Sequence, residues 1–174
     1  MCSAPGRLSG EPLSPDNLGK DTMKEKKPLG WREWIAFPGL NIRRIKAKID
    51  TGARTSALHA FMVEPFSRDS QPWVRFAIHP VQGDTDTVVE CEAPIKDQRI
   101  VRDSGGHDEL RYVIDAIITI GSDQIHSEVT LTDRDTMMFR VLLGRTAVRK
   151  KYVVYPGKSY LQGQPAGISD SFGK

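Results

Sequence analysis

Asp50, Thr51 and Gly52 are the residues of this sequence best suited to chemistry by their types and spacing. They directly follow Ile49, the last residue of an alternating apolar run, so Asp50 stands where a strand is expected to meet a turn. A carboxylate in that position can accept or donate a proton, and the glycine lets other backbone segments come close. A carboxylate that only stabilises the turn is the alternative, and the tripeptide alone favours that simpler interpretation.

A second segment, Leu142-Leu143-Gly144-Arg145, lies well downstream and places two large apolar residues before a glycine and a cation. After it, the sequence predicts a short helix over 145–151. Between the two segments, Gly105-Gly106 precedes a long apolar stretch and predicts a hairpin tip or a flap, with an ordinary surface hairpin as the alternative. The two segments can form one site only if the fold brings their strands together.

The elements that must position these residues are mostly strands. Apolar and polar residues alternate, or apolar residues run together, over 45–49, 74–78, 89–93, 112–120, 125–131, 141–143 and 152–155. Residues 121–124 predict the turn of a hairpin. Many short strands separated by loops, with one short helix, predict an all-β barrel or sandwich.

The composition is compatible with one folded domain and a tail, because the chain has 174 residues, of which 39% are hydrophobic and 27% charged. We expect a disordered tail over 1–27, a folded domain over 28–162 and a flexible tail over 163–174. No apolar run approaches the ~20 residues of a membrane-spanning helix, and no secretory signal is evident. Two cysteines and a net charge of +3 favour a cytoplasmic protein without a nucleic-acid partner.

The two segments together resemble the retropepsin pattern. In that fold, the strand carrying the catalytic Asp is threaded by a loop built on an apolar-apolar-Gly segment, and a short helix follows. The resemblance is closer still to a bacterial and archaeal retropepsin-like family that carries the name ATP-dependent zinc protease, whose members often occur with RimK-type glutamate ligases. It covers most of residues 29–161 and rests on IDTGARTSALHA from Ile49, on Arg102 with Arg111, and on 131–134 leading into the segment 139–145.

The resemblance implies aspartic peptidase chemistry in a closed, retropepsin-like barrel. Two carboxylates then share one proton across a water, which attacks the peptide carbonyl. This chain has only one Asp-Thr-Gly, so the resemblance implies a homodimer in which the Asp50 residues of two subunits meet at a two-fold axis. Thr51 would support that meeting point through its hydroxyl group, and Gly52 would complete the catalytic loop. Leu142, Leu143, Gly144 and Arg145 would support the loop structurally.

Arg54 departs from the retropepsin pattern, because retroviral enzymes commonly have an Asp there that pairs with the Arg of the second segment. Here Arg54 and Arg145 carry like charges, so that ion pair cannot form in the usual way. The acids that could compensate are Asp103, Asp108, Glu109, Asp133 and Asp135. Arg54 is therefore either half of a structural ion pair with one of these acids or a group that binds anionic substrate.

The second interpretation of Arg54 predicts an acidic substrate. Arg102 and Arg111 on the expected flap would line the same cleft, together with Ala53, and Lys46 or Lys48 could extend it. His59, nine residues after Asp50, is a further candidate for substrate binding, with a local structural role as the alternative.

Metal and nucleotide chemistry have little support in the sequence. The four histidines are His59, His79, His107 and His126, and none belongs to an HExxH, HxH or CxxC-type pattern. Gly157-Lys158-Ser159 lacks the upstream glycine of a phosphate-binding loop. Cys91 stands between two glutamates in a predicted strand and is expected to be a core thiol. We therefore expect no cofactor, with a scattered zinc site left open as an alternative.

The sequence thus predicts a homodimeric aspartic endopeptidase that acts on acidic or glutamate-rich protein segments and has a functional link to a RimK-type glutamate ligase. A non-catalytic module that binds acidic tails on the same fold is the alternative from another class, and a zinc-dependent hydrolase is the third.

Overall fold

The computed structural model describes residues 25–102, 106, 108–133 and 138–166. The first 24 residues of the expected N-terminal tail and the last eight of the C-terminal tail therefore lie outside the described residues, as do Asp103, Gly105, His107 and Asp135. The predicted domain boundaries remain predictions.

Within the described residues, the chain forms strands, one 3-10 helix and one short α-helix. They are β1 (Lys27–Gly30), β2 (Arg32–Phe37), η2 (Pro38–Leu40), β3 (Ile42–Asp50), β4 (Ser56–His59), β5 (Met62–Arg68), β6 (Gln71–Ile78), β7 (Val89–Pro94), β8 (Asp97–Arg102), β9 (Asp108–Ile120), β10 (Asp123–Thr132), β11 (Val141–Gly144), α1 (Arg145–Val148) and β12 (Tyr152–Tyr155). None of these helices is long and apolar enough to cross a membrane. The prediction of an all-β fold with one short α-helix is confirmed.

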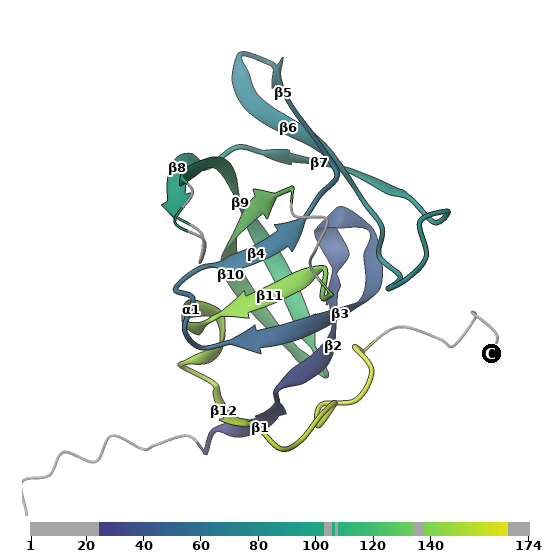
Figure 1. Cartoon of the computed structure of the whole chain (residues 1–174), viewed down its shortest axis with the longest axis vertical. Coiled ribbons are helices and arrows are strands. Elements are labelled where there is room, and N and C mark those ends of the chain that lie inside the picture. Colours follow the sequence, from purple (N-terminus) through teal and green to yellow (C-terminus); the bar gives the residue numbers. More distant parts are fainter. Residues whose placement is uncertain (1–24, 103–105, 107, 134–137, 167–174) are drawn as a thin grey trace, which may run out of the picture.

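The main sheet curls into a ring (Figure 1). Its strand order is β10-β4-β11-β3-β2-β9-β8, and an additional antiparallel pairing of β9 with β10 brings the sheet back on itself. β2 and β9 share only two residue pairs, Ile35 with Ile120 and Ala36 with Thr119. We call this β2–β9 contact the seam of the barrel. The barrel is not strictly closed, because the hydrogen-bonded pairing at the seam covers only a short part of the two strands.

Alternation along the strands builds the core inside this ring. In β3, Ile45 and Ala47 are almost fully buried, and Ile114 and Ile118 of β9 belong to the same buried core cluster. Because side chains alternate between the two faces of a strand, the residues between them point outward. This periodicity is the signal from which the strands were predicted.

Two smaller sheets flank the ring. β5, β6 and β7 form an antiparallel sheet at the top of Figure 1, and β1 pairs in parallel with β12 at the bottom. The predicted helix over 145–151 is shorter in the structure and ends at Val148. Its last turn is lost because Tyr152 must be extended to pair with Lys27 of β1.

Candidate active site

The strand order places β11 between β3 and β4, which are joined by the loop 51–55 (Figure 1). β11 runs parallel to β3, with Gly144 opposite Asp50, and antiparallel to β4, with Leu142 opposite Ala57. The loop that follows Asp50 therefore crosses the end of β11. The two motifs predicted to cooperate are brought together by this crossing.

Backbone contacts fix the crossing. The amide of Gly144 donates to the Ser56 hydroxyl oxygen at 3.1 Å, and the amide of Arg145 donates to the Ala53 carbonyl oxygen at 2.8 Å. A Cβ atom on Gly144 would lie 2.5 Å from the carbonyl carbon of Thr55. Only glycine allows the loop and the strand to approach this closely.

The Asp50 carboxylate is half-buried at the end of β3. Its Oδ1 accepts hydrogen bonds from the amides of Gly52 at 3.1 Å and Ala53 at 3.2 Å. Among the described residues, no donor binds Oδ2. One oxygen is thus held by the loop while the other stays available to a water or a substrate.

Arg145 does not pair with a carboxylate in the described part of the chain. Its guanidinium Nη1 donates to the Thr51 carbonyl oxygen at 2.8 Å, which ties it to the loop after Asp50. The next residue, Thr146, donates through its amide and its hydroxyl to the carbonyl oxygen of Arg54. These contacts give Arg145 a position in loop support that needs no acidic partner.

A cleft of about 420 Å³ opens beside Asp50. The loop after β3 and the outer faces of β4 and β11 form one side, and the hairpin of β8 and β9 contributes the other. Its lining residues are Asp50, Ala53, Arg54, Thr55, Ala57, Arg99, Val101, Arg102, Arg111, Thr130 and Leu142. The predicted hairpin is thus present beside the carboxylate, although most of its tip lies outside the described residues.

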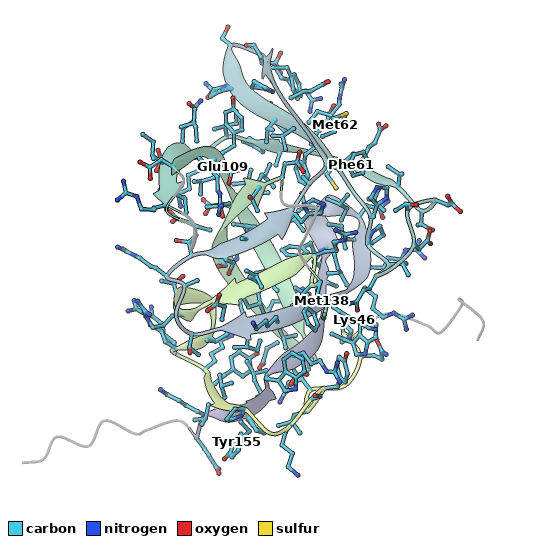
Figure 2. The ribbon with its side chains drawn as sticks, viewed as in Figure 1. Lys46, Phe61, Met62, Glu109, Met138 and Tyr155 are labelled. Atoms are coloured by element: carbon cyan, nitrogen blue, oxygen red, sulfur yellow. The ribbon has the colours of Figure 1, made fainter. Side chains whose placement is uncertain are left out.

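Four arginines line this cleft, and three of them already have carboxylate partners. Arg99 pairs with Asp97 and with Glu128, both at 2.7 Å. Arg102 pairs with Asp108 at 2.8 Å, and Arg111 pairs with Glu109, labelled in Figure 2, at 2.7 Å. Asp108 and Glu109 are therefore taken up by hairpin arginines.

Arg54 is the cleft arginine whose guanidinium has no hydrogen bond or ion pair within the part of the chain that the structure describes. Of the five acids considered as partners, Asp108 and Glu109 bind other arginines, Asp133 makes no ion pair within the described chain, and Asp103 and Asp135 lie outside the described residues. Among the described residues, none of these acids pairs with Arg54, so its guanidinium is available there to an anion.

The charge of Glu128, and with it the ion pair to Arg99 of the cleft, depends on the pH of the solution. Its hydrogen bond to Arg99, and a second one to Lys96, lower the pKa of this carboxyl from 4.5 to about 2. Because the folded pKa is lowered, ionised Glu128 stabilises the fold above pH 4.5, and this contribution is lost as the pH falls through about 2. We expect Glu128→Gln to flatten the acid side of the stability profile, read as the urea midpoint of unfolding between pH 6 and pH 2. Parallel profiles for the two proteins would contradict this account.

The remaining predicted residues are distributed as follows. Leu143 is fully buried beneath the loop, whereas Leu142 faces the cleft. His59 lies at the far end of β4, is 1% exposed and does not line the cleft. Its amide donates to the Arg140 carbonyl oxygen at 2.8 Å. The geometry thus places His59 in the packed sheet rather than beside Asp50.

Sequence reasoning missed Arg99 and Glu128. Arg99 carries no local signal, because its place opposite Arg111 depends on the register of the β8–β9 hairpin. No local pattern marks Glu128, which reaches Arg99 only because β10 pairs with β9.

In the described residues, no three His, Cys, Asp or Glu side chains are grouped so that they could hold a metal ion. Cys91 is 4% exposed, and burial raises the pKa of its thiol to about 11. Its Sγ donates to the Leu40 carbonyl oxygen at 3.3 Å, as expected for a core thiol.

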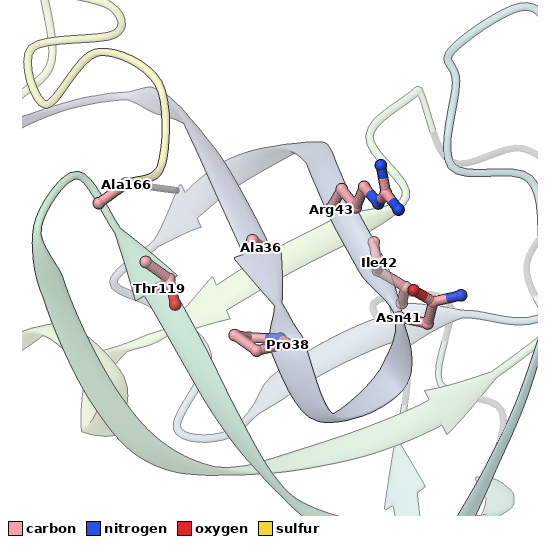
Figure 3. Close-up of a pocket in the computed structure, with 7 residues that line it drawn as sticks. All are labelled: Ala36, Pro38, Asn41, Ile42, Arg43, Thr119 and Ala166. Carbon is pink, nitrogen blue, oxygen red and sulfur yellow. The ribbon is translucent and has the colours of Figure 1, made fainter. Parts of the chain in front are cut away.

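A smaller cavity of about 170 Å³ lies near the seam between β2 and β9 (Figure 3). It is lined by Ala36, Pro38, Asn41, Ile42, Arg43, Thr119 and Ala166. The buried Thr119 hydroxyl has no hydrogen-bond partner among the described residues. No carboxylate, thiol or imidazole lines this cavity, so the Asp50 cleft is the candidate active site.

Comparison with known families gives one match over most of the chain. Residues 28–165 match the RimB-like family, described as retropepsin-like aspartic endopeptidase RimB. The matched range contains the Asp-Thr-Gly loop, the β8–β9 hairpin and the segment 142–145.

Curated relatives also match most of the chain. A probable alpha-L-glutamate ligase from Shewanella pealeana is 43% identical over 140 residues, which are 80% of this chain and 31% of the relative. One from Desulfotalea psychrophila is 40% identical over 149 residues, which are 86% of this chain and 32% of the relative. The chain therefore spans about a third of the length of these relatives.

A solved structure shares the fold. The crystal structure of a protein of unknown function from Legionella pneumophila superposes with a TM-score of 0.67 at 22% identity. The match covers 79% of this chain and 99% of the Legionella chain.

Proposed function

This chain belongs to the RimB-like family of retropepsin-like aspartic endopeptidases, and from that premise we propose that it hydrolyses peptide bonds with a water held between two Asp50 carboxylates. The resemblance found in the sequence is thereby confirmed at the level of the family. The two carboxylates come from the two subunits of a homodimer.

The geometry of Asp50 supports this proposal most directly. Two loop amides bind its Oδ1, the strand β11 holds the loop in place, and a cleft opens beside it. In the proposed dimer, two Asp50 carboxylates share one water. Two carboxylates that share one water cannot both ionise, so one stays protonated. Their two pKa values then belong to the pair and to neither residue alone.

The reaction follows from that shared proton. The ionised Asp50 removes a proton from the water, whose oxygen attacks the carbonyl carbon of the peptide bond. The protonated Asp50 of the other subunit donates its proton to the carbonyl oxygen. The tetrahedral diol then collapses: the Asp50 that took the proton from water gives it to the leaving nitrogen, one diol hydroxyl returns a proton to the other Asp50, and the C–N bond breaks.

A homodimer is needed because each chain supplies one Asp-Thr-Gly. Thr51 is exposed at the start of the loop, where its hydroxyl could bind the partner's loop across a two-fold axis. An isolated subunit would hold one carboxylate and would be inactive by this mechanism.

The cleft arginines support an acidic substrate. Arg54 projects a planar cation that is suited to a carboxylate, and Arg102 and Arg111 line the same cleft. The curated relatives are named probable alpha-L-glutamate ligases. We propose that the substrate is a glutamate-rich or glutamate-tailed protein segment, and that a RimK-type ligase is the functional partner that adds such tails.

The test compares wild type with Asp50→Asn on a glutamate-tailed protein, read by intact mass with and without a metal chelator. We expect chelator-resistant shortening by wild type and a loss of at least about 10³-fold in rate for the variant. Shortening that stops when chelator is added would favour the zinc-dependent hydrolase instead.

A binding module for acidic tails is the second candidate. The observation that favours it is that the Arg54 guanidinium has no ion pair within the described part of the chain. It predicts that neither wild type nor Asp50→Asn shortens the tail, while both bind it and Arg54→Ala does not.

A further inference from the structure

The outward side chains of β2 and β3 form a second basic surface beside the cleft. We call it the β2–β3 cationic face, and it consists of Arg32, Arg44, Lys46 and Lys48. The intervening residues Ile45, Ala47 and Ile49 are buried in the core. The cations of β3 therefore share the outer side of the strand, and this row ends at Asp50.

The face is continuous with the Asp50 cleft. β3 and β11 run side by side in Figure 1, and Lys48 stands directly opposite Leu142 in their ladder. Leu142 lines the cleft. Lys46, labelled in Figure 2, lies one outward position further from Asp50 on the same strand. A ligand leaving the cleft along β3 would pass these two lysines.

Aromatic rings hold the distal part of the face in place. The Lys46 Nζ lies 5.2 Å from the centre of the Trp34 ring, and the Arg44 guanidinium lies 4.9 Å from it. Trp34 also stacks on Tyr160 at 5.6 Å, and the guanidinium of Arg32 lies 5.2 Å from the Tyr160 ring. Cations ordered on rings lose less conformational freedom when they bind an anion.

The face contains little negative charge. In β2 and β3, which are described throughout, the only acids are Asp50 and Glu33, and Glu33 is fully buried and accepts the amide of Gly30 at 2.6 Å. Lys46 and Lys48 make no ion pair within the described chain. Lys48 even stands directly opposite Arg32 in the ladder. Like charges in that position destabilise a sheet, so an anion bound there would relieve their repulsion.

We propose that the β2–β3 cationic face is an exosite that binds the acidic stretch of the substrate as it leaves the Asp50 cleft. The proposal rests on the proposed function, because it assigns a binding surface to the part of the acidic substrate that lies outside the cleft. Outward residues of a strand repeat at about 6.6 Å, and alternate glutamates of an extended peptide repeat at the same spacing. In a glutamate chain lying along β3, successive carboxylates on one side would therefore reach Lys48 and Lys46 in turn.

An acidic peptide suits this surface better than single-stranded RNA. RNA binding of that kind uses open aromatic faces on which bases stack. Here the Trp34 ring is covered by Tyr160, Arg44 and Lys46. Lys46 and Lys48 make no ion pair within the described chain, but the ring on which a base would stack is occupied.

The test measures binding of fluorescent peptides to the Asp50→Asn protein by anisotropy. One peptide has about ten glutamates, long enough to span the cleft and the face at ~3.3 Å per residue, and the other is a glutamate tripeptide. Lys46→Glu and Lys48→Glu are compared with Lys150→Glu, an exposed reversal of equal charge on the turn after α1. We expect Lys46→Glu or Lys48→Glu alone to weaken the long peptide about threefold and the two together about tenfold, and Lys150→Glu, the charge-matched control for each single reversal, to leave it unchanged.

The tripeptide should bind equally well to all variants, because it fits within the cleft. Equal weakening by Lys150→Glu, or unchanged binding after the double reversal, would overturn the exosite. Tighter binding of an oligouridine of similar length than of the long peptide would assign the face to nucleic acid instead.

The same variants separate this proposal from the proposed function. If wild type fails to shorten a glutamate tail but the reversals still weaken binding of the long peptide, the exosite is supported and the proposed peptidase activity is wrong. If wild type shortens the tail and the reversals change neither binding nor KM, the exosite alone is wrong.

Discussion

Asp50→Asn subunits are expected to inactivate the wild-type subunits with which they pair. The proposed mechanism needs one ionised and one protonated carboxyl at the same water, and a mixed dimer supplies only one carboxyl group. At equal amounts of the two subunits, random pairing leaves about one quarter of the dimers fully wild type. Activity per total protein should therefore fall to about one quarter of the wild-type value, and should follow the square of the wild-type fraction.

The measurement co-refolds the two proteins at several ratios and follows the cleavage of a glutamate-tailed substrate. Lys150→Glu subunits serve as the matched diluent, because this exposed side chain makes none of the contacts described around Asp50. Their addition should leave activity per total protein unchanged. A linear decline with the fraction of Asp50→Asn would show that each subunit works alone, and the shared-carboxylate mechanism would then be wrong.

Strands with one buried face were predictable from the sequence because burial imposes a period of two. In β6, Val74, Phe76 and Ile78 are all fully buried, and their alternation was visible. β4 escaped prediction because its four residues, Ser56–His59, are all buried and do not alternate. β8 escaped for the opposite reason, since Ile100 is 72% exposed and the apolar signal there does not mark a core face.

The meeting of Asp50 with Gly144 was predictable only through the family resemblance. Nothing in either local pattern states that β11 inserts between β3 and β4. Once that crossing is known, the need for glycine at position 144 follows, because a side chain there would collide with the backbone of Thr55. The family match confirms the resemblance, and the crossing shows its physical basis.

Side-chain partners were less accessible, because they depend on register across strands. His59 was a candidate for substrate binding on account of its nearness to Asp50 in the chain. Three residues of extended strand, ~10 Å, separate it from Ser56 at the loop, which is enough to carry it into the packed part of the sheet. The pairing of Arg99 with Glu128 likewise needs three neighbouring strands in correct register.

Gly144→Ala is expected to be the most destabilising single methyl group that can be added at the site. The new Cβ would lie 2.5 Å from the Thr55 carbonyl carbon, 2.6 Å from its oxygen and 2.8 Å from the Arg54 carbonyl oxygen. All three atoms belong to the backbone, so no side chain can rotate away. The loop or β11 must shift, at a cost of about 3 kcal/mol, the upper end for overpacking. That shift would also displace Asp50, whose backbone pairs with Gly144.

Gly157→Ala is the matched control, because its Cβ would meet nothing within 4 Å, and it should change the free energy of unfolding by less than about 0.5 kcal/mol. The measurement is the urea midpoint of unfolding of both variants, together with the soluble yield should Gly144→Ala fail to fold. The effect is steric and not conformational, because Gly144 has an ordinary φ of −73° that alanine adopts freely. Equal stability of the two variants would therefore mean that the loop and β11 are not in the close contact on which the position of Asp50 depends.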